Sequence, residues 1–312
     1  MVKIGFNKKG IKLYNADCFN VFPKIKDKSI DLFVLDLPYG VTACAWDTVI
    51  DLEKMWVEIK RIMKPSAILC FFCTTKFGYT LIKSNEKWFK YDLIWQKSRK
   101  VGFLSANKRQ LRNHENIYVF KEEQGTYHPQ KTEGHKPFNK GLKTNTNIYG
   151  EDNFKTKVNL KGDRHPTSII EHENIYVFKD KQGSYNPQKT EGKPYTATRK
   201  TAGYYREKEG EYNENITENK GDRHPTSIIE NTILKYNNPH KTIHRTEKPI
   251  GLLEYLIKTY SNEGDTIMDF CAGSLSCGIA AFNTKRKFIG VEMDKTNYDL
   301  GLQRIKEHIE KL

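Results

Sequence analysis

The stretch DTIMDFCAGSLSCGIAAFNTKRKFIGVEMD, residues 265–294, decides the fold class of this chain. Its pattern predicts a strand that ends at Asp269, a tight turn of small residues, a helix, and a second strand that ends at Glu292. Such a unit lets the backbone near Gly273 approach a nucleotide-type ligand. The later acid, 23 residues after Asp269, is then placed to take a pair of ribose hydroxyls.

Two common nucleotide motifs do not fit this turn. Gly273 and Gly278 match the start of a P-loop, but Ile279 and Ala280 stand where Lys and Ser or Thr are needed. Leu275 occupies the place of the second glycine in the dinucleotide pattern. A plain junction between a strand and a helix is therefore the alternative interpretation of this segment.

Strand and helix patterns alternate on both sides of a polar middle region. Period-two and short apolar runs predict strands, and apolar residues at helical spacing predict helices. Strands are expected at residues 11–13, 29–35, 67–73, 91–95, 117–120, 266–269 and 287–292, and helices at 51–63, from Pro249 to Tyr260 and from Tyr298 to Ile309. This alternation predicts one α/β domain, built from both chain ends, with a mixed, mostly parallel sheet covered by helices on both faces.

A second motif, LDLPYGVTACAWD at residues 35–47, follows the buried strand predicted at 29–35. The apolar run halts at Asp36, Leu37, Pro38 and Tyr39, so a carboxylate, a proline and an aromatic ring lie where a strand leaves the sheet. An ordinary strand exit with Pro and Gly is the alternative explanation.

The middle of the chain is basic and contains an internal repeat. The net charge is +14, and residues 97–250 hold 29 basic and 19 acidic residues, so +10 of the excess lies there. A phosphate-binding face and a solvated Lys-rich surface both explain such an excess. The repeated sequences are HENIYVFK at 114–121 and 172–179, PQKTEG at 129–134 and 187–192, and GDRHPTSIIE at 162–171 and 221–230. Only one HENIYVF strand can follow the strand at 91–95, and the first copy is favoured because its connection is shorter.

The cysteines and the hydropathy narrow the class of protein further. Six cysteines show no disulfide rhythm, and Cys70 and Cys73 lie inside an apolar run without a second pair, so we expect a core strand and no metal site. No stretch approaches the roughly 18 apolar residues of a membrane span, and the first residues lack the apolar centre of a secretory signal. We therefore expect a soluble, cytoplasmic protein with no membrane partner.

Taken together, the motifs resemble those of amino-methylating DNA methyltransferases that use S-adenosylmethionine (SAM), in their circularly permuted beta class. Asp36-Leu37-Pro38-Tyr39 resembles the catalytic D-P-P-Y motif, and residues 269–274 resemble the D-x-F-x-G-S-G cofactor loop. HRTEKPIGLLEYLI at 244–257 is similar to the H-P-T-Q/E-K-P segment, and Asn15-Ala16-Asp17 is similar to the turn whose acid reaches the adenine of SAM. The order of the motifs also fits, and the resemblance covers about 190 residues at the two ends.

The resemblance implies a Rossmann-like SAM-dependent methyltransferase fold with a basic insert. Asp36 and the carbonyl of Leu37 would accept the hydrogens of an adenine amine, Pro38 would aim that carbonyl, and Tyr39 would stack on the flipped base. Asp36 favours the 6-amino group of adenine, because the cytosine 4-amino enzymes usually carry Ser there. The implied SAM contacts are Asp17, Thr246, Lys248, Asp269, Phe270, Ala272, Gly273, Ser274 and Glu292.

Two departures from the family pattern affect these expectations. Leu37 replaces a proline, but its carbonyl survives the change. Leu275 replaces a glycine where SAM would pass the backbone, so its side chain is expected to crowd the methionine moiety. Leu275 and the tandem repeat favour one rival interpretation, a catalytically degenerate DNA-binding protein, and a methyltransferase for cytosine, RNA or protein amines is another.

The resemblance also divides the chain and suggests partners. Residues 1–120 would form the catalytic half, 121–240 the insert that recognises the target, and 241–312 the SAM-binding half. Double-stranded DNA is the expected partner, and a second copy of the chain and a cognate restriction endonuclease are further candidates. The residues expected to hold DNA phosphates are Lys97, Arg99, Lys100, Lys108, Arg109 and Arg112.

Overall fold

A computed structural model describes residues 4–40, 48–131 and 247–311, together with short pieces at 161, 163, 165–166, 168, 190–191, 195–201, 213–219 and 222–223. The chain divides into two compact units. The first unit combines Met1–Trp95, Glu115–Ile170 and Thr232–Leu312. The second unit combines Gln96–His114 and Glu171–Asn231.

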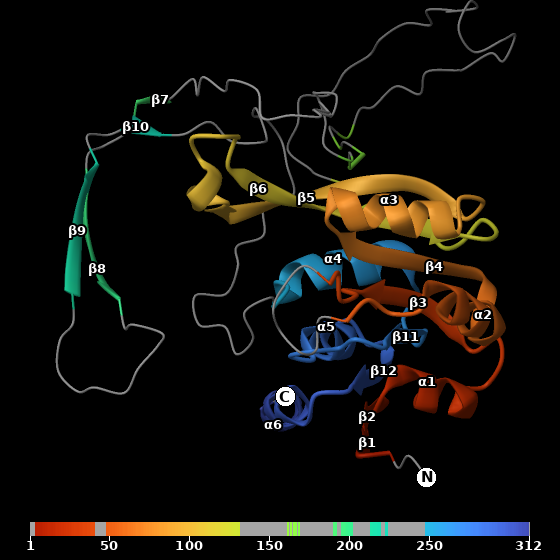
Figure 1. Cartoon of the computed structure of the whole chain (residues 1–312). Helices are drawn as coiled ribbons and strands as arrows, with labels where there is room; N and C mark the ends of the chain where they lie inside the picture. The colour runs from red at the N-terminus through yellow and green to blue at the C-terminus, as the bar shows by residue number, and fades with distance from the viewer. Residues whose placement is uncertain are drawn as a thin grey trace, which may run out of the picture. The chain divides into compact units, whose positions relative to one another are not determined.

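One eight-stranded sheet contains strands from both ends of the chain (Figure 1). Its order is β1 (Phe6–Lys8), β2 (Ile11–Asn15), β12 (Lys287–Glu292), β11 (Thr266–Asp269), β3 (Ile30–Leu35), β4 (Met63–Cys73), β6 (Arg112–Lys121) and β5 (Phe89–Val101). The two C-terminal strands thus lie between N-terminal strands β2 and β3. This placement confirms that the chain ends share one α/β domain.

The pairing directions make the sheet mixed and mostly parallel, as predicted. Strands β2, β12, β11, β3 and β4 run parallel to one another, whereas β1 pairs antiparallel with β2 and β6 pairs antiparallel with β4. Strand β6 contains the first HENIYVF copy and aligns Val119 with Cys70. The first copy therefore fills the predicted place in the sheet, and the second copy, at 172–178, lies outside the described residues.

Helices cover both faces of the sheet because strand residues alternate between two apolar clusters. In β3, Leu32 and Val34 belong to the cluster shared with α4 (Ile250–Tyr260), α5 (Ser276–Asn283) and α6 (Lys295–Glu310). Phe33 and Leu35 belong to the opposite cluster, shared with α1 (Cys18–Val21), α2 (Leu52–Ile62) and α3 (Thr75–Ser84). The sheet is therefore the central layer of three.

Side-chain caps explain where several of these helices begin. Asp51 accepts a hydrogen bond from the backbone of Lys54 at the start of α2, and Asp294 does the same for Asn297 at the start of α6. Helix α2 ends at Ile62, and β4 begins at the next residue, two residues before Pro65. The predicted helix at 51–63 is thus confirmed to within a residue at each end.

The remaining described pieces carry short antiparallel ladders. Strand β7 (Thr190–Glu191) pairs with β10 (Asp222–Arg223), and β8 (Tyr195–Thr201) pairs with β9 (Asn213–Asn219). Cys70 and Cys73 are buried in β4 as core residues, as predicted. Among the described residues, no helix has the length and apolar character needed to cross a membrane.

Candidate active site

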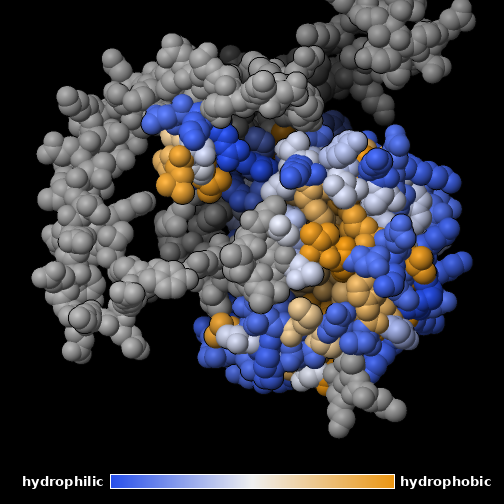
Figure 2. All heavy atoms as spheres, in the orientation of Figure 1, coloured by the Kyte–Doolittle hydropathy of each residue, from blue (hydrophilic) through white to orange (hydrophobic). Residues whose placement is uncertain are grey.

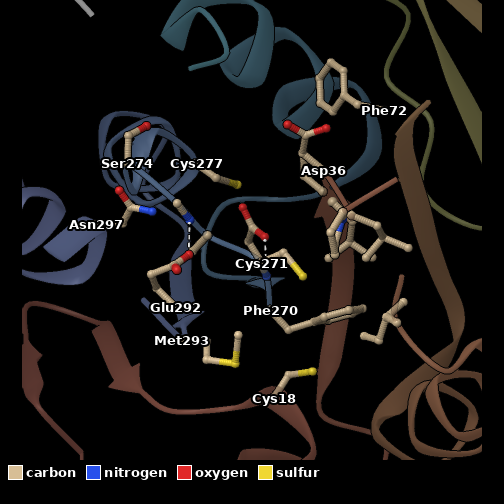
Figure 3. A pocket seen from close by; sticks show the side chains of 18 of the residues that line it. Cys18, Asp36, Phe72, Phe270, Cys271, Ser274, Cys277, Glu292, Met293 and Asn297 are labelled. Carbon is tan, nitrogen blue, oxygen red and sulfur yellow. Dashed lines mark hydrogen bonds between the residues drawn. The ribbon is translucent and has the colours of Figure 1, made fainter. Parts of the chain in front are cut away.

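A cavity of about 480 Å³ lies where the parallel strands end. Its walls come from the residues that follow β2, β3, β11 and β12, because the carboxyl ends of parallel strands meet at one edge of the sheet. Figure 3 shows Asp36 and Phe72 on one side of it, and Ser274, Glu292 and Asn297 on the other. The predicted residues that it gathers are Asp17, Asp36, Leu37, Pro38, Tyr39, Lys248, Asp269, Phe270, Ala272, Gly273, Ser274 and Glu292.

Both carboxylate oxygens of Asp36 are engaged. The hydroxyl of Tyr39 lies 2.7 Å from Oδ1 and 2.8 Å from the carbonyl oxygen of Phe72, and the Lys248 Nζ donates to Oδ2 at 2.5 Å. Burial, and then the negative charge of Asp36, raises the pKa of Tyr39 well above its usual value, so this hydroxyl stays protonated. Asp36 is therefore a fixed, charge-paired acceptor at the cavity wall.

Lys248 is the cation at the centre of this cluster. It is buried, its Nζ lies 3.6 Å from a Glu115 carboxylate oxygen, and it sits 5.0 Å from the centre of the Phe72 ring. Burial works to lower the pKa of Lys248, but the Asp36 and Glu115 carboxylates outweigh it and raise the pKa above its ordinary value. We predicted Lys248 as a cofactor contact, and the structure pairs its ammonium group with Asp36.

The turn after β11 is held in place by the acid after β12. The backbone N–H of Gly273 donates to Glu292 Oε2 at 2.7 Å, and the N–H of Asp294 donates to Oε1 at 2.8 Å. Gly273 has φ +48°, and a Cβ placed there would meet no atom within 4 Å. Backbone is therefore open to a ligand at this position, as a close approach to a cofactor requires.

Two acids on this side of the cavity have perturbed protonation. Asp269 Oδ1 accepts the N–H of Cys271 at 3.0 Å, but burial raises the pKa of Asp269 to about 8, with Asp36 and Glu292 adding to the rise. Burial also raises the pKa of Glu292, against the two N–H groups that it accepts. Asp17 also lines the cavity, and its Oδ1 caps α1 by accepting the N–H of Phe19 at 2.8 Å.

The expectation that Leu275 crowds the cofactor is wrong. Leu275 is fully buried, and its side chain fills the space that a Cβ would need at Gly301, only 2.8 Å away, and at Gly290, 3.2 Å away. Its backbone is left-handed, with φ +57° and ψ +24°. A glycine suits this position because of that backbone conformation, and the leucine side chain points into the core beneath α6.

Residues that sequence reasoning missed form a polar network along the same wall. Arg304 contacts Glu247 at 2.5 Å and the Ser276 hydroxyl at 2.9 Å, and Ser276 also donates to Glu247 at 3.1 Å. Glu247 could have been predicted from the sequence, because it lies between two predicted site residues, Thr246 and Lys248. Arg304 gave no such signal, since it comes from α6, and Thr246 itself lies outside the described residues.

The predicted phosphate contacts belong to the second unit. Lys97 and Lys100 lie on β5, Lys108 and Arg109 in the following turn, and Arg112 at the start of β6. Arg99 is also on β5, but its side chain is not described. Within the described ranges, no group of three or more His, Cys, Asp or Glu side chains is arranged to hold a metal ion.

This geometry defines a class of protein. A mostly parallel sheet carries, at one edge, an open-backbone turn tied to an acid and, beside it, a charge-paired aspartate. Such α/β proteins bind a nucleotide-type cofactor next to a reacting group. A comparison with protein families matches residues 30–303 to the DNA methylases that modify the amino groups of adenine or cytosine, and the chain belongs to this family.

Individual relatives agree with this assignment. The DNA adenine methyltransferase YhdJ of Escherichia coli is 42% identical over 62 residues, which are 20% of this chain and 21% of that protein. The type II methyltransferase M.HpaI of Haemophilus parainfluenzae is 30% identical over 81 residues, 26% of each protein. These matches span about a fifth to a quarter of the relatives. The type II methyltransferase M1.MboII of Moraxella bovis is 21% identical over 297 residues, 91% of this chain and 92% of that protein.

Solved structures show the same fold. The M1.HpyAVI–SAM complex has a TM-score of 0.51 at 16% identity, and the match covers 94% of this chain and 99% of that one. The cytosine-N4-specific PvuII DNA methyltransferase also has a TM-score of 0.51, at 11% identity, covering 99% of this chain and 96% of that one. The predicted Rossmann-like methyltransferase fold is thereby confirmed.

Proposed function

We propose that this protein transfers a methyl group from SAM to the 6-amino group of adenine in double-stranded DNA. The observation that carries the proposal is the Asp36 carboxylate, fixed by Lys248 in the cavity that also contains the Gly273 turn. An aspartate at this position, where the cytosine enzymes usually carry serine, favours adenine. The short match to an adenine methyltransferase supports the same choice.

The cavity suits SAM in size, backbone access and charge. Its volume of about 480 Å³ lies within the range of about 300–1,000 Å³ that is usual for small-molecule sites. When bound, SAM supplies an electrophilic methyl group on a sulfonium cation. Glu292 already holds the Gly273 N–H, and its remaining lone pairs would accept ribose hydroxyls. The Glu292 carboxyl group also lines the cavity and favours a cationic cofactor over its neutral product, whereas Asp269, with its pKa raised to about 8, adds little negative charge near neutral pH.

Asp36 would act on the adenine amine as a hydrogen-bond acceptor. The lone pair of that amine is delocalised into the ring, and two acceptors aimed at its hydrogens localise the pair toward the methyl group. Asp36 and the carbonyl of Leu37 would be these acceptors, and Lys248 would hold the Asp36 carboxylate in its orientation. Tyr39 now contacts Oδ1, so an arriving amine would displace its hydroxyl from that oxygen.

A catalytically silent DNA-binding protein loses its main support. Crowding by Leu275 was the reason to expect weak cofactor binding, and that side chain is packed in the core. A calorimetric titration with SAM tests this point directly. Measurable binding heat supports the enzyme, whereas no heat at millimolar SAM supports the silent protein.

The substrate is tested by following the methyl group. Long-read sequencing of DNA from cells that express the protein reports activity, target base and recognition sequence together. Purified protein with labelled SAM should then label duplex DNA in preference to RNA or protein, and digestion to nucleosides should yield N6-methyladenine. N4-methylcytosine in the digest would contradict the adenine assignment while leaving the family intact.

The division of the chain follows from the same proposal. Residues 1–120 and 241–312 would be the catalytic and SAM-binding halves, and residues 121–240 the target-recognition insert. DNA would be the principal partner, in the cytoplasm of a bacterial or phage-infected cell. A second copy of the chain and a cognate endonuclease remain candidate partners, and sedimentation of the purified protein would test the first.

A further inference from the structure

The turn that joins β5 to β6 has a compact, internally bonded tip. Gly102 adopts φ +93°, and the short 3-10 helix Phe103–Ser105 follows it. The N–H of Ser105 donates to the carbonyl of Gly102 at 2.9 Å, and the N–H groups of Lys108 and Arg109 both donate to the carbonyl of Ser105. These bonds hold the tip in one shape, so little conformational entropy remains to be lost when it binds a partner.

Large apolar side chains project from this tip. Leu104 is fully exposed, Phe103 is 64% exposed and Val101 is 49% exposed. Figure 2 shows apolar surface bordered by hydrophilic surface at the place that this turn occupies in Figure 1. Single exposed apolar residues are common in proteins, but three within four consecutive positions mark a contact surface.

The surroundings of the tip are strongly cationic. Residues 96–114 contain six Lys or Arg residues and no Asp or Glu. Lys108 and Arg109 lie four and five residues after Leu104, in the same turn, and both are exposed. This arrangement is complementary to duplex DNA, because the cations can pair with the phosphates while the apolar side chains contact the stacked base faces between them. An anionic membrane offers similar chemistry, but membership of the DNA methylase family favours DNA.

We propose that Phe103 and Leu104 form a wedge that enters the base stack of DNA while Lys108 and Arg109 hold the flanking phosphates. This proposal rests on the proposed function, because it gives the enzyme a way to stabilise an opened stack. Side chains of this kind unstack base steps in other DNA-bending proteins. The wedge needs no particular base, so it contributes affinity for opened DNA rather than sequence recognition.

The test compares two duplexes of the same mixed sequence, one intact and one with a single abasic site. An abasic site has already lost one stacked base, so the full-length protein should bind that duplex more tightly. Leu104→Ala and Phe103→Ala should each weaken binding to the abasic duplex by about tenfold or more and abolish the preference for it. Leu104→Trp should keep the preference. Leu300→Ala is the matched control, because Leu300 is 42% exposed on α6.

Salt dependence separates the wedge from its cationic surroundings. Lys108→Ala and Arg109→Ala should each lower the slope of log affinity against log salt concentration by about 1, with the abasic preference kept. The two apolar variants should leave this slope unchanged, since they remove no phosphate contact. Melting temperatures equal to that of the wild type would show that every variant is folded.

Several results would overturn the wedge. Leu104→Ala and Phe103→Ala could bind both duplexes as the wild type does. Loss of binding to phosphatidylglycerol vesicles with unchanged DNA affinity would assign the tip to a membrane, and conversion of a dimer to a monomer would assign it to a second copy. Methyl transfer by the wild-type protein tests the proposed function separately from the wedge. If the wild-type protein methylates DNA and the variants bind both duplexes as it does, the wedge is rejected and the proposed function stands.

Discussion

Asp36 directly follows β3, Asp269 is the last residue of the neighbouring parallel strand β11, and both line the same cavity. Their surroundings differ. Asp36 accepts the Lys248 ammonium group on one oxygen and the Tyr39 hydroxyl on the other. Asp269 is buried, and the contact that holds it is the backbone N–H of Cys271. The pKa of Asp269 accordingly rises to about 8.

This difference separates what topology provides from what neighbouring side chains provide. A parallel sheet brings any acids that follow its strands to one edge, whatever their role. A buried cation fixes Asp36 as a charge-paired acceptor, whereas burial raises the pKa of Asp269 to about 8 and leaves it mostly protonated near neutral pH. The catalytic role proposed for Asp36 therefore depends on Lys248 as much as on the D-L-P-Y motif.

The largest effect is expected from Asp36→Ala. Methyl transfer should fall by about 1,000-fold or more, because the acceptor aimed at the amine is lost, while SAM affinity should stay within a few fold. Asp51→Asn is the matched control, since Asp51 lines the same cavity but caps α2, and asparagine also caps helices. Equal losses of SAM binding and methyl transfer in Asp36→Ala would contradict the assigned role.

Replacing Lys248 tests whether the cation distinguishes the two acids. Lys248→Met removes the ammonium group that fixes the Asp36 carboxylate at the cavity wall, so methyl transfer should fall by about 100-fold. Lys248→Arg keeps a cation beside Asp36 and should retain most of the activity. Steady-state rates of methyl transfer to duplex DNA check both variants. A wild-type rate in Lys248→Met would show that Asp36 does not need the cation.

Asp269 should make stability depend on pH. Its folded pKa of about 8 exceeds the value of about 3.9 in unfolded chains, so the folded state binds more protons between these limits. Its contribution is fully present below about pH 4 and is lost as the pH rises to about 8. Urea denaturation at a series of pH values should show this decline in the wild type and a flatter curve in Asp269→Asn. Parallel curves would mean that Asp269 titrates normally.

Much of this fold could be predicted because periodicity is a local property of the sequence. The central strands and helices α2, α4 and α6 have clear apolar patterns. Helix α3 was not predicted, and Gly78 in its interior weakens the helical signal. A Cβ at Gly78 would lie 1.9 Å from the Tyr118 ring, so the glycine leaves room for this side chain of β6. That contact is distant in sequence and cannot be predicted from a local pattern.

The site was predicted less completely for the same physical reason. The motif residues after β3 and β11 were identified, because strand exits and small-residue turns leave a local signature. The contact of Lys248 with Asp36 and Glu115 joins three distant parts of the chain, and only the folded structure brings them together. Glu115 left one signal, an acid next to the apolar run of β6. The direction of the Leu275 side chain depends on a left-handed backbone conformation, which a leucine in the sequence does not predict.

The smallest functional effect is expected at Leu275, which tests whether the turn after β11 acts through its backbone. Leu275→Ala and Leu275→Gly should both leave the dissociation constant of SAM unchanged, because the side chain packs against Gly301 and Gly290. Leu275→Ala should lower the free energy of unfolding by about 2–5 kcal/mol through the cavity that it leaves. Leu275→Gly removes more apolar surface but also relieves about 1 kcal/mol of strain at φ +57°. The glycine variant should therefore be at least as stable as the alanine variant, as measured by denaturant unfolding. Tighter SAM binding by either variant would show that the leucine does reach the cofactor site.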